Sequence, residues 1–270
     1  MNDLPPLLDY VDDSVAYAPL RPGDERIVLD RCVIFLGMTP GPRDTVVARL
    51  RMTAGEVPQV VAEVRRVLRS RGRTRELWAA SDAGPAGLAD ALRRLGMGPV
   101  PAPFTRCAVM VRAGEPPQVG MLPTNVRVTQ VRTADDFRRA QEIYWTCFGQ
   151  PPEAEAPLAQ DFARLCGSDS WVRFLAWRVD AQGARAVAAA DAVAMAQGVI
   201  LVGGATLPAA RGGGAYRALV WARWQLAEAR GTPILWTEAG AESAPVLGRL
   251  GFAQTGMIDY FVDGAVAGDA

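Results

Sequence analysis

The residues most suited to chemistry form a glycine-rich turn between an apolar strand and an amphipathic helix. Within the segment Leu207–Arg217 stand Arg211, Gly212, Gly213, Gly214 and Ala215. The first turn of a helix has backbone N–H groups without partners, and these donors, with the positive end of the helix dipole, suit a diphosphate. Glycines let the backbone approach the anion closely, and the arginine adds a fixed, forked positive charge. The segment therefore predicts a pyrophosphate-binding loop.

A flexible turn without a ligand is the alternative interpretation of these glycines. The strand before them, the helix after them and Pro208, which withholds an N–H and ends the strand, favour anion binding. The turn has neither the Gly-x-Gly-x-x-Gly pattern of dinucleotide sites nor the Gly-Lys-Ser/Thr of triphosphate loops. Dinucleotide binding and kinase or ATPase chemistry are therefore disfavoured.

Hydrophobic spacing and turn residues outline the elements that must position this loop. In the second half, helices are predicted at Ala134–Phe148, Ala154–Cys166, Ala215–Arg230 and Ser243–Leu250. Strands are predicted at Trp171–Val179, Ala186–Ala196, Val199–Thr206 and Pro233–Glu238, with one or two more in Phe252–Val262. The turns at residues 180–183 and 197–198 suit antiparallel hairpins.

The first half ends in a similar order of elements, with helices at Pro58–Ser70 and Pro85–Leu95 around the strand Glu76–Ala80. In both halves a strand is followed by a turn of small residues, a helix with proline near its start, and Arg-Leu-Gly-apolar. We interpret this as an internal duplication; chance similarity of two helix-capping sequences is the alternative. After the predicted strand Thr45–Met52, residues 53–57 carry neither the arginine nor the glycine run.

The composition excludes several kinds of catalysis and partner. None of the 270 residues is histidine, which excludes Ser-His-Asp and Cys-His catalysis and His-ligated metals. Lys plus Arg equals Asp plus Glu at 29 each, so the net charge of zero gives no electrostatic reason to expect nucleic acid or a membrane as the main partner. The basic stretch Arg65–Arg75 is interpreted as a solvated helix end.

Four cysteines lie far apart in the sequence: Cys32, Cys107, Cys147 and Cys166. Their spacing disfavours a metal site and a disulfide framework and favours a reducing cytoplasm. The N-terminus has no basic region followed by a long apolar run, and no stretch reaches the roughly 20 apolar residues of a membrane span. These features predict a soluble cytoplasmic protein.

The segment from about Val126 to Val262 resembles the GNAT superfamily of N-acetyltransferases. The family signature is an apolar strand, then Val-x-Pro-x-x-Arg/Gln-x-x-Gly-x-Gly/Ala, then a helix; here it reads Thr206-Leu-Pro-Ala-Ala-Arg-Gly-Gly-Gly-Ala-Tyr216. Downstream, Ala-Pro-Val-Leu-Gly-Arg-Leu-Gly-Phe252 resembles the family's short helix ending in Gly-Phe. The first half resembles a GNAT repeat whose loop has been lost.

The resemblance implies an α/β fold (α+β with a mixed sheet) of two tandem GNAT-like domains, each a mostly antiparallel central sheet flanked by helices. Residues 1–113 would form the degenerate domain and residues 126–270 the domain that binds acetyl-CoA. Residues 114–125, in a stretch rich in proline and glycine, would form the linker.

The resemblance also implies roles for particular positions, with acetyl-CoA as the co-substrate. The backbone of Ala205, Thr206 and Leu207 would pair with the pantetheine arm in the manner of an added strand, and Arg211–Tyr216 would hold the pyrophosphate. The acetyl carbonyl would lie where this strand separates from Pro233–Glu238, with its oxyanion facing a backbone N–H. A primary amine of a small molecule or peptide would then attack the thioester directly.

Two positions depart from the family pattern. The motif's last position, usually glycine or alanine, is Tyr216, whose side chain need not obstruct the backbone donors. The family often places a tyrosine four residues before the glycine of Gly-Phe to protonate the departing thiolate, and this sequence has Leu247 there. Leucine cannot donate a proton, although solvent can protonate a thiolate near neutral pH.

Glu238, at the end of its strand, is the candidate general base, acting through water; an exposed strand-end carboxylate is the alternative. Ser243 is a candidate pantetheine ligand, or only the N-cap of its helix. Asp191 is either buried near the amine site or turned to water, and Tyr260 either lines the acceptor pocket or packs on the sheet. The aromatic residues around Tyr144 occupy the region that usually shapes a GNAT acceptor site, whereas Trp221 and Trp224 are expected to pack.

These expectations favour an acetyl-CoA-dependent N-acetyltransferase, an acyltransferase that acts on an amine of a small molecule or peptide and that could form a homodimer. A second hypothesis is an acyl-CoA-binding pseudoenzyme with a regulatory or scaffolding role, which Leu247 and the absence of histidine favour. A third is a structural protein with a glycine-rich turn. Binding of acetyl-CoA separates the third from the other two, and thiol release on a panel of amines separates the first from the second.

Overall fold

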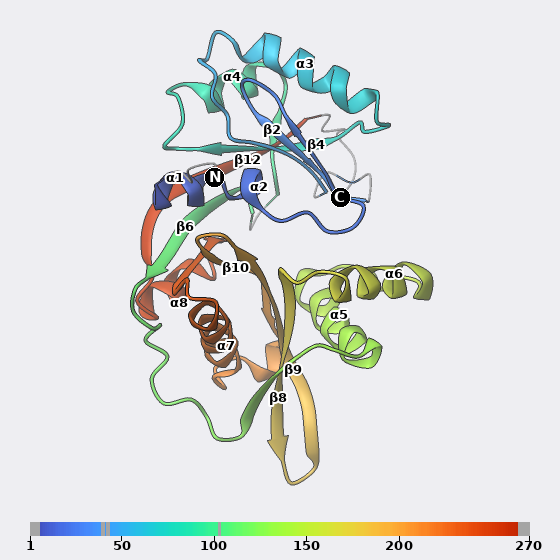
Figure 1. Cartoon of the computed structure of the whole chain (residues 1–270), viewed down its shortest axis with the longest axis vertical. Helices are drawn as coiled ribbons and strands as arrows, with labels where there is room; N and C mark the ends of the chain where they lie inside the picture. The colour runs from blue at the N-terminus through green and yellow to red at the C-terminus, as the bar shows by residue number, and fades with distance from the viewer. Residues whose placement is uncertain (1–5, 39–40, 42–43, 102–103, 264–270) are drawn as a thin grey trace. The chain divides into compact units, whose positions relative to one another are not determined.

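The computed structural model describes residues 6–38, 41, 44–101 and 104–263 (Figure 1). Its elements form a mixed α/β fold in which sheets are flanked by helices, as the sequence predicts. The chain divides into two compact units. Unit 1 comprises Met1–Met110, Glu238–Val246 and Gln254–Ala270, and unit 2 comprises Val111–Thr237 and Leu247–Ala253. None of the helices in the described residues is long and apolar enough to cross a membrane.

The sheet of unit 1 has the strand order β1-β2-β3-β4-β12-β6, with the short β5 also paired to β12. Its strands are β1 (Glu25–Val28), β2 (Val33–Leu36), β3 (Thr45–Ala48), β4 (Glu76–Ser81), β5 (Gly98–Pro99), β6 (Arg106–Ala113) and β12 (Ala253–Asp263). The β3–β4 pair is parallel, and β1–β2, β2–β3 and β4–β12 are antiparallel. Its helices are α1 (Leu7–Asp12), α2 (Ser14–Tyr17), α3 (Val57–Arg69) and α4 (Leu88–Arg94).

Helix α3 packs on this sheet through a stripe of valines and leucine: Val57, Val60, Val61, Val64 and Leu68. Their spacing of three and four residues places them on one helical face, so the opposite face carries the arginines and faces water. Pro58 stands in the first turn, where its missing N–H costs no hydrogen bond. The stripe, with Trp78 and Phe261, forms the core of unit 1.

The last strand joins the first half of the chain. β12 is one strand and pairs with β4 from Ile258↔Ser81 to Asp263↔Glu76. Because this ladder and Phe261 tie residues 254–263 to unit 1, the compact units differ from the predicted segments 1–113 and 126–270. The sequence predicted one or two strands in Phe252–Val262, but the sequence of a strand does not determine which strand it pairs with.

Unit 2 contains the sheet order β11-β10-β9-β8-β7, with three antiparallel pairs and the parallel pair β10–β11. Its elements are β7 (Val126–Gln130), α5 (Ala134–Phe148), α6 (Glu155–Cys166), β8 (Trp171–Asp180), β9 (Gly183–Met195), β10 (Gly198–Thr206), α7 (Ala215–Ala229), β11 (Ile234–Ala239) and α8 (Ala244–Arg249); the last two run on into unit 1. All of the predicted second-half elements are present, with ends shifted by at most a few residues. The hairpins β8–β9 and β9–β10 confirm the predicted antiparallel turns.

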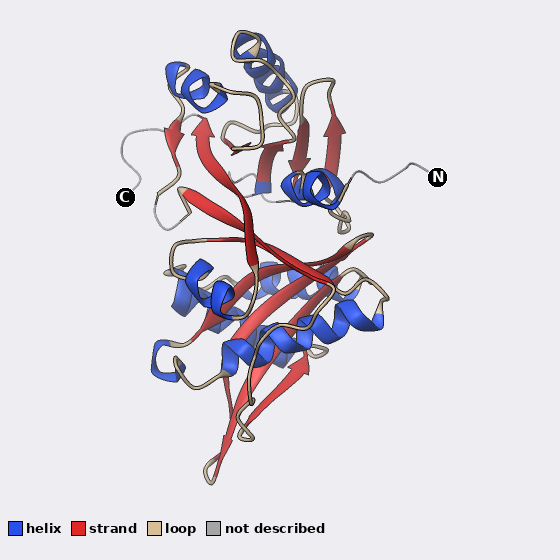
Figure 2. Ribbon diagram, turned by 90° about the vertical axis from the view of Figure 1, so that its left-hand side faces the viewer, coloured by secondary structure: helices blue, strands red, loops and turns tan. Residues whose placement is uncertain are grey.

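Helices cover both faces of this sheet (Figure 2). Helix α5 packs on one face against Leu175 and Ala189, and α7 packs on the other against Ala188 and Ala190. Because neighbouring strand residues point to opposite faces, the alanine run of β9 serves both helices. Small side chains there allow α5 and α7 to approach the sheet closely.

The two units repeat one arrangement of strand, helix and parallel strand. In unit 1, β3 leads through α3 to β4, with Val47 opposite Trp78. In unit 2, β10 leads through α7 to β11, with Ile200 opposite Trp236. The matching register of the two tryptophans supports the internal duplication inferred from the sequence.

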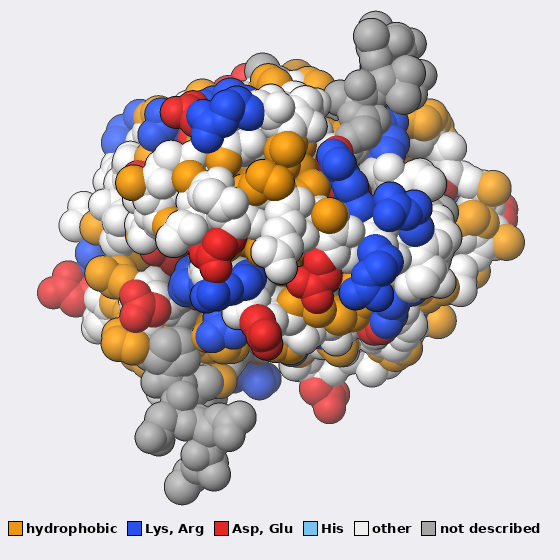
Figure 3. Space-filling view, turned by 90° about the horizontal axis from the view of Figure 1, so that it is seen from above, with side chains coloured by type: hydrophobic (Ala, Val, Ile, Leu, Met, Phe, Trp, Pro, Cys, Tyr) orange, Lys and Arg blue, Asp and Glu red, His pale blue; other side chains and the backbone are white. Residues whose placement is uncertain are grey.

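The basic stretch near the end of α3 is paired with carboxylates of unit 1. Arg65 binds both oxygens of Asp263 at 2.6 and 2.7 Å, and Arg71 pairs with Glu25 at 2.9 Å. Basic and acidic side chains are interspersed over the face shown in Figure 3. These pairs agree with a solvated helix end.

The packing of β12 predicts that Phe261→Ala destabilises the protein. Phe261 is 1% exposed in the core of unit 1, so its truncation should lower the free energy of unfolding by about 3 kcal/mol. Urea unfolding followed by fluorescence measures this change, with the exposed Val179→Ala as the control expected within about 0.5 kcal/mol. A loss below about 1 kcal/mol for Phe261→Ala would contradict the placement of β12.

Candidate functional site

The glycine-rich loop joins β10 to α7 in a conformation that only glycine adopts easily. A short 3-10 turn, Pro208–Ala210, follows the strand, and Ala215 begins the helix. Gly212 and Gly214 have φ angles of 76° and 80°, in the left-handed region. The chain therefore turns tightly twice and exposes its backbone just before the helix.

Backbone donors at this helix end are unpaired. Gly213 donates to the Ala210 carbonyl at 3.3 Å. Five other N–H groups of the loop and first turn donate to no acceptor among the described residues: those of Gly212, Gly214, Ala215, Tyr216 and Arg217. Unpaired donors and the helix dipole together make this end a site for an anion.

Arginines surround the loop, including one that the sequence did not single out. A β-carbon at Gly213 would overlap the guanidinium of Arg178 from β8, so that side chain lies directly against the loop backbone. Arg217 donates to the Val119 carbonyl at 2.8 Å, and Arg211 is exposed. Arg211 opposes the rise that burial causes in the pKa of the Cys147 thiol. Positive charge is thus available from two elements.

A bulge interrupts β10 just before the loop. The register moves from Val202↔Asp191 to Ala205↔Ala189, so two glycines, Gly203 and Gly204, stand opposite one residue. Bulged residues leave the ladder and bend the strand. Gly204 is exposed, and Gly203 has φ 60°.

β10 also separates from β11 along this stretch. The pairing of β10 with β11 ends at Ile200↔Trp236. The next carbonyl, that of Leu201, accepts instead from the Thr237 hydroxyl at 2.8 Å. Beyond that point β10 is paired to β9 on its other edge. The Thr206 hydroxyl is buried without a partner, which is costly unless a ligand completes its bonds.

Two tyrosines contact the bulge from opposite helices. The Tyr144 hydroxyl of α5 lies 3.5 Å from the position of a β-carbon on Gly203, and the Tyr216 ring of α7 lies 2.9 Å from that position on Gly204. The absence of a β-carbon on Gly204 is what admits the Tyr216 ring, whereas at Gly203 glycine is favoured by its positive φ. The bulge is therefore enclosed by phenols on both faces.

Asp191 is the centre of a buried charge network, and it does not face water. Arg173 binds both of its carboxylate oxygens at 2.7 and 2.9 Å, and the Tyr144 hydroxyl donates to the same carboxylate at 3.0 Å. The Arg173 guanidinium also stacks 4.6 Å from the centre of the Phe137 ring. Sequence analysis did not find Arg173, because the partners lie 18 and 47 residues from Asp191.

Glu238 and Ser243 belong to unit 1, whereas the loop belongs to unit 2. The half-buried Glu238 carboxylate accepts a hydrogen bond from the Tyr260 hydroxyl, so it is not an exposed strand end. Burial raises the pKa of Glu238, and the Tyr260 bond opposes that rise. The Ser243 hydroxyl donates to the Gly240 carbonyl at 3.2 Å, and no backbone N–H of the described residues caps onto it. Trp224 packs in the core at 2% exposure.

The corresponding helix of unit 1, α3, has Glu56 as its N-cap residue in place of a glycine run. Glu56 accepts from the Thr53 N–H at 2.8 Å and from the Thr53 hydroxyl at 2.9 Å, and it pairs with Arg31 at 2.8 Å. The carboxylate makes no hydrogen bond to the N–H groups of the helix, and its negative charge disfavours a second anion at this helix end. Among the described residues, no group of three or more Cys, Asp and Glu side chains is placed to hold a metal ion.

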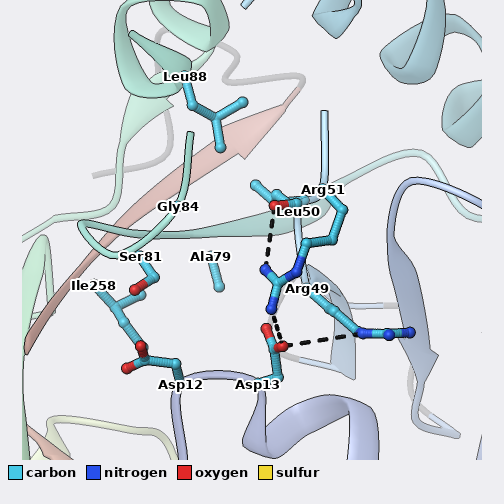
Figure 4. Close-up of a pocket in the computed structure, with 10 residues that line it drawn as sticks. All are labelled: Asp12, Asp13, Arg49, Leu50, Arg51, Ala79, Ser81, Gly84, Leu88 and Ile258. Atoms are coloured by element: carbon cyan, nitrogen blue, oxygen red, sulfur yellow. Dashed lines mark hydrogen bonds and ion pairs between the residues drawn. The ribbon is translucent and has the colours of Figure 1, made fainter. Parts of the chain in front are cut away.

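A small cavity of about 280 Å³, which includes space open to solvent, lies where β3 separates from β4 in unit 1 (Figure 4). Asp13 is paired with Arg51 and lies 4.0 Å from Arg49, which has a strained φ of 53°. Asp12 makes no such pair in the described structure. Burial, then repulsion from Asp13 and Asp82, raises the pKa of Asp12 from 3.8 to about 6.

Solved structures with a similar fold include GNAT proteins. A GCN5-related N-acetyltransferase from Kribbella flavida is 18% identical, covers 91% of each chain and superposes with a TM-score of 0.67. One from Sphaerobacter thermophilus is 15% identical over 86% of this chain and 80% of its own, with a TM-score of 0.62. A tandem GNAT protein from the clavulanic acid biosynthesis pathway is 15% identical over 99% of this chain and 91% of its own, with a TM-score of 0.60.

No protein-family model and no curated protein sequence matches the chain. The structural similarity spans both units and includes a tandem protein, so the predicted tandem GNAT fold is confirmed.

The raised pKa of Asp12 predicts a pH-dependent stability difference. Between pH 3.8 and about 6 the folded protein binds more protons at this carboxyl than the unfolded chain, so ionisation of Asp12 weakens the fold as pH rises. Because the carboxyl is partly exposed and screened by solvent, we expect Asp12→Asn to stabilise the protein by about 1 kcal/mol at neutral pH. The two proteins should be equally stable in acid, below both pKa values.

Urea unfolding at both pH values measures this difference, and Asp169→Asn, at an exposed position, serves as the control. A loss of stability in Asp12→Asn at neutral pH would show that the carboxylate has a favourable partner.

Proposed function

From this tandem GNAT fold, we propose that the protein is an N-acetyltransferase that moves an acetyl group from acetyl-CoA to a primary amine. The observation that carries the proposal is the row of unpaired N–H groups at the start of α7, beside a strand with a free edge. A pyrophosphate supplies the acceptors that these donors need. A glycine-rich turn that did not lead into a helix would not present such a row of unpaired N–H groups.

The pantetheine arm would extend along the unpaired edge of β10. Its amides would act as an added strand against Ala205 and Thr206, and the buried Thr206 hydroxyl would gain a partner. The pyrophosphate would lie on the loop, where Arg178 and Arg211 supply positive charge. These residues fit a substrate with an anionic head and a polar, extended arm.

The bulge would hold the reacting thioester. Backbone N–H groups released from the ladder at Gly203 and Gly204 can face the developing oxyanion, which preorganised donors stabilise strongly. The amine would attack the carbonyl carbon while its proton passes through water to Glu238. The raised pKa of that carboxylate suits a base that works near neutral pH.

The acceptor amine is a small molecule or a peptide terminus in this proposal. Acetyl-CoA as co-substrate and four unpaired cysteines suit a reducing, cytoplasmic setting. All 29 basic side chains are arginines, so the protein has no lysine to accept acetyl groups itself. Transfer of labelled acetyl groups can therefore be read without a background of lysine autoacetylation.

An acyl-CoA-binding pseudoenzyme is the second candidate. Leu247, 1% exposed, stands where the family often has its acid, which favours binding without turnover. Thiol release on a panel of primary amines decides between the two functions. Release above the rate without enzyme supports the transferase, and saturable binding without release supports the pseudoenzyme.

The loop geometry predicts binding of one acetyl-CoA per chain. Calorimetry should give a stoichiometry of one, because the turn before α3 in unit 1 has neither the glycine run nor the arginine and carries the negative charge of Glu56. Arg178→Met should weaken binding about tenfold through lost charge-assisted contact. Gly214→Ala should weaken it at least as much, because its φ is 80° and a β-carbon would lie 2.6 Å from Pro123.

Arg127→Met is the matched control, since Arg127 is exposed on β7 and adjacent residues of that strand pack toward α7. Equal affinity for acetyl-CoA in the control and in Arg178→Met would show that Arg178 does not contribute to binding. Absence of any binding heat with the unmodified protein would show that acetyl-CoA is not a ligand.

The pairing of Glu238 with Tyr260 predicts a shift in the pH profile of kcat/KM. Activity should rise with pH as Glu238 loses its proton, and Glu238→Gln should lower it on the order of 100-fold. Tyr260→Phe removes the bond that lowers the Glu238 pKa, so its rising limb should move to higher pH. Identical profiles for Tyr260→Phe and the unmodified enzyme would mean that another group is the base.

A further inference from the structure

Arg223 of α7 is a fully buried arginine with incomplete hydrogen bonding. It is 1% exposed; its Nε donates to the Leu219 carbonyl at 3.0 Å and its Nη1 to the Asp191 carbonyl at 3.3 Å. Its Nη2 has no acceptor in hydrogen-bonding geometry. A buried charge with a free donor costs stability, so its presence at the bulge calls for a compensating role.

The Tyr216 hydroxyl interacts with this guanidinium. A guanidinium has donors only, so any hydrogen bond between the two groups would use the tyrosine oxygen as the acceptor. The phenolic proton of Tyr216 would then be available to a bound substrate. Tyr144, the other phenol at the bulge, differs because it donates its proton to the Asp191 carboxylate.

The position of Tyr216 matches the place where a proton is needed. Its ring lies against Gly204, which is exposed and belongs to the part of β10 that β11 does not cover. A thioester on that edge would therefore have this phenol beside it. Leu247 cannot serve, because it is buried and has no proton to give.

We propose that Tyr216 is the acid that protonates the departing thiolate and that Arg223 is its positioning residue; this inference rests on the proposed acetyl transfer. The amine nitrogen forms a bond to the carbonyl carbon, the carbon–sulfur bond breaks, and the sulfur takes the Tyr216 proton. The amine's proton leaves through Glu238, and water reprotonates the phenolate. The two departures from the family motif, Tyr216 and Leu247, thereby compensate each other.

The electrostatics of the pair suit this role. Burial raises the pKa of Tyr216, so the phenol keeps its proton at neutral pH, while the Arg223 charge and bond oppose that rise. The charge also stabilises the phenolate that donation leaves behind. Tyr144 and Asp191 interact with Arg223 from its other side, and Arg173 neutralises the carboxylate of Asp191. Arg223 is thus the one charged neighbour that acts directly on Tyr216 among the described residues.

Tyr216→Phe tests the acid. Its kcat should fall on the order of 100-fold, while the dissociation constant for acetyl-CoA stays within about threefold, because binding at this position uses the backbone N–H. In the unmodified enzyme the rate should decline at high pH as Tyr216 ionises, and in Tyr216→Phe that decline should be absent. An unchanged kcat or an unchanged alkaline limb, with thiol release intact, would overturn the proposal.

Arg223 is tested by ultraviolet titration of tyrosine, a measurement that needs no turnover. The signal of Tyr216 is the difference between each protein and the same protein carrying Tyr216→Phe. Arg223→Met should move the Tyr216 pKa upward, and Arg223→Lys should restore part of the shift because it keeps the charge. If Arg223→Met fails to fold, a Tyr216 pKa in Arg223→Lys above that of the unmodified protein still reports the effect. A Tyr216 pKa that does not change in the variant that folds would overturn the role of Arg223.

Failure of the proposed function gives a different result from failure of this inference. If the unmodified protein binds acetyl-CoA but releases no thiol with any amine, the transferase proposal and the acid fall together. If the unmodified protein releases thiol and Tyr216→Phe releases it at the same rate, only the assignment of Tyr216 as the acid is wrong.

Discussion

The unpaired edge of β10 is the constraint on which the proposed site depends. A strand inside a sheet satisfies its backbone groups with two neighbours, but β10 loses β11 after Ile200. The bulge at Gly203 and Gly204 bends the strand away, and the glycine run then turns it into α7. The backbone N–H and C=O groups that lose their partners in these two steps follow one another along β10 and the loop before α7. A ligand that follows this path restores hydrogen bonds that the fold itself leaves open.

Buried charge at the bulge gives that edge a defined shape. Arg173 donates to the side-chain carboxylate of Asp191, and Arg223 donates to the backbone carbonyl of Asp191. The two arginines approach from opposite faces of the sheet. Removing one partner would strand a charge in a low-dielectric interior, which costs far more than the pair contributes. The network therefore holds Tyr144 against Gly203. Rigidity at this point follows from electrostatics as much as from apolar packing.

The two units show how one arrangement of strands can keep or lose a ligand site. Both contain a parallel pair with tryptophan at the same register position, so the sheet geometry is shared. They differ at the helix end, where unit 2 has free N–H groups and unit 1 has the carboxylate of Glu56. A negative charge at the start of a helix suits the helix dipole and disfavours a bound anion. Unit 1 instead contains β4, the strand that pairs with the last strand, β12.

The sequence by itself determined the elements whose signals are local. The helix at 134–148 was predicted to the residue from its apolar spacing and from Gly149, and the structure adds that Thr133 caps its start. The loop was predicted from consecutive glycines before an amphipathic helix, since only glycine takes these backbone angles readily. The fold followed from the order of such elements and from the motif.

Tertiary structure alone decided which distant residues meet. Arg178 reaches Gly213, Tyr260 reaches Glu238, and Arg173 with Tyr144 reaches Asp191, although each pair is far apart in the chain. The pairing of β12 with β4 likewise could not be foreseen, because alternation marks a strand's buried face and not its neighbour. Local conformation is set by the residues that adopt it, whereas contacts and pKa values are set by the whole packed chain.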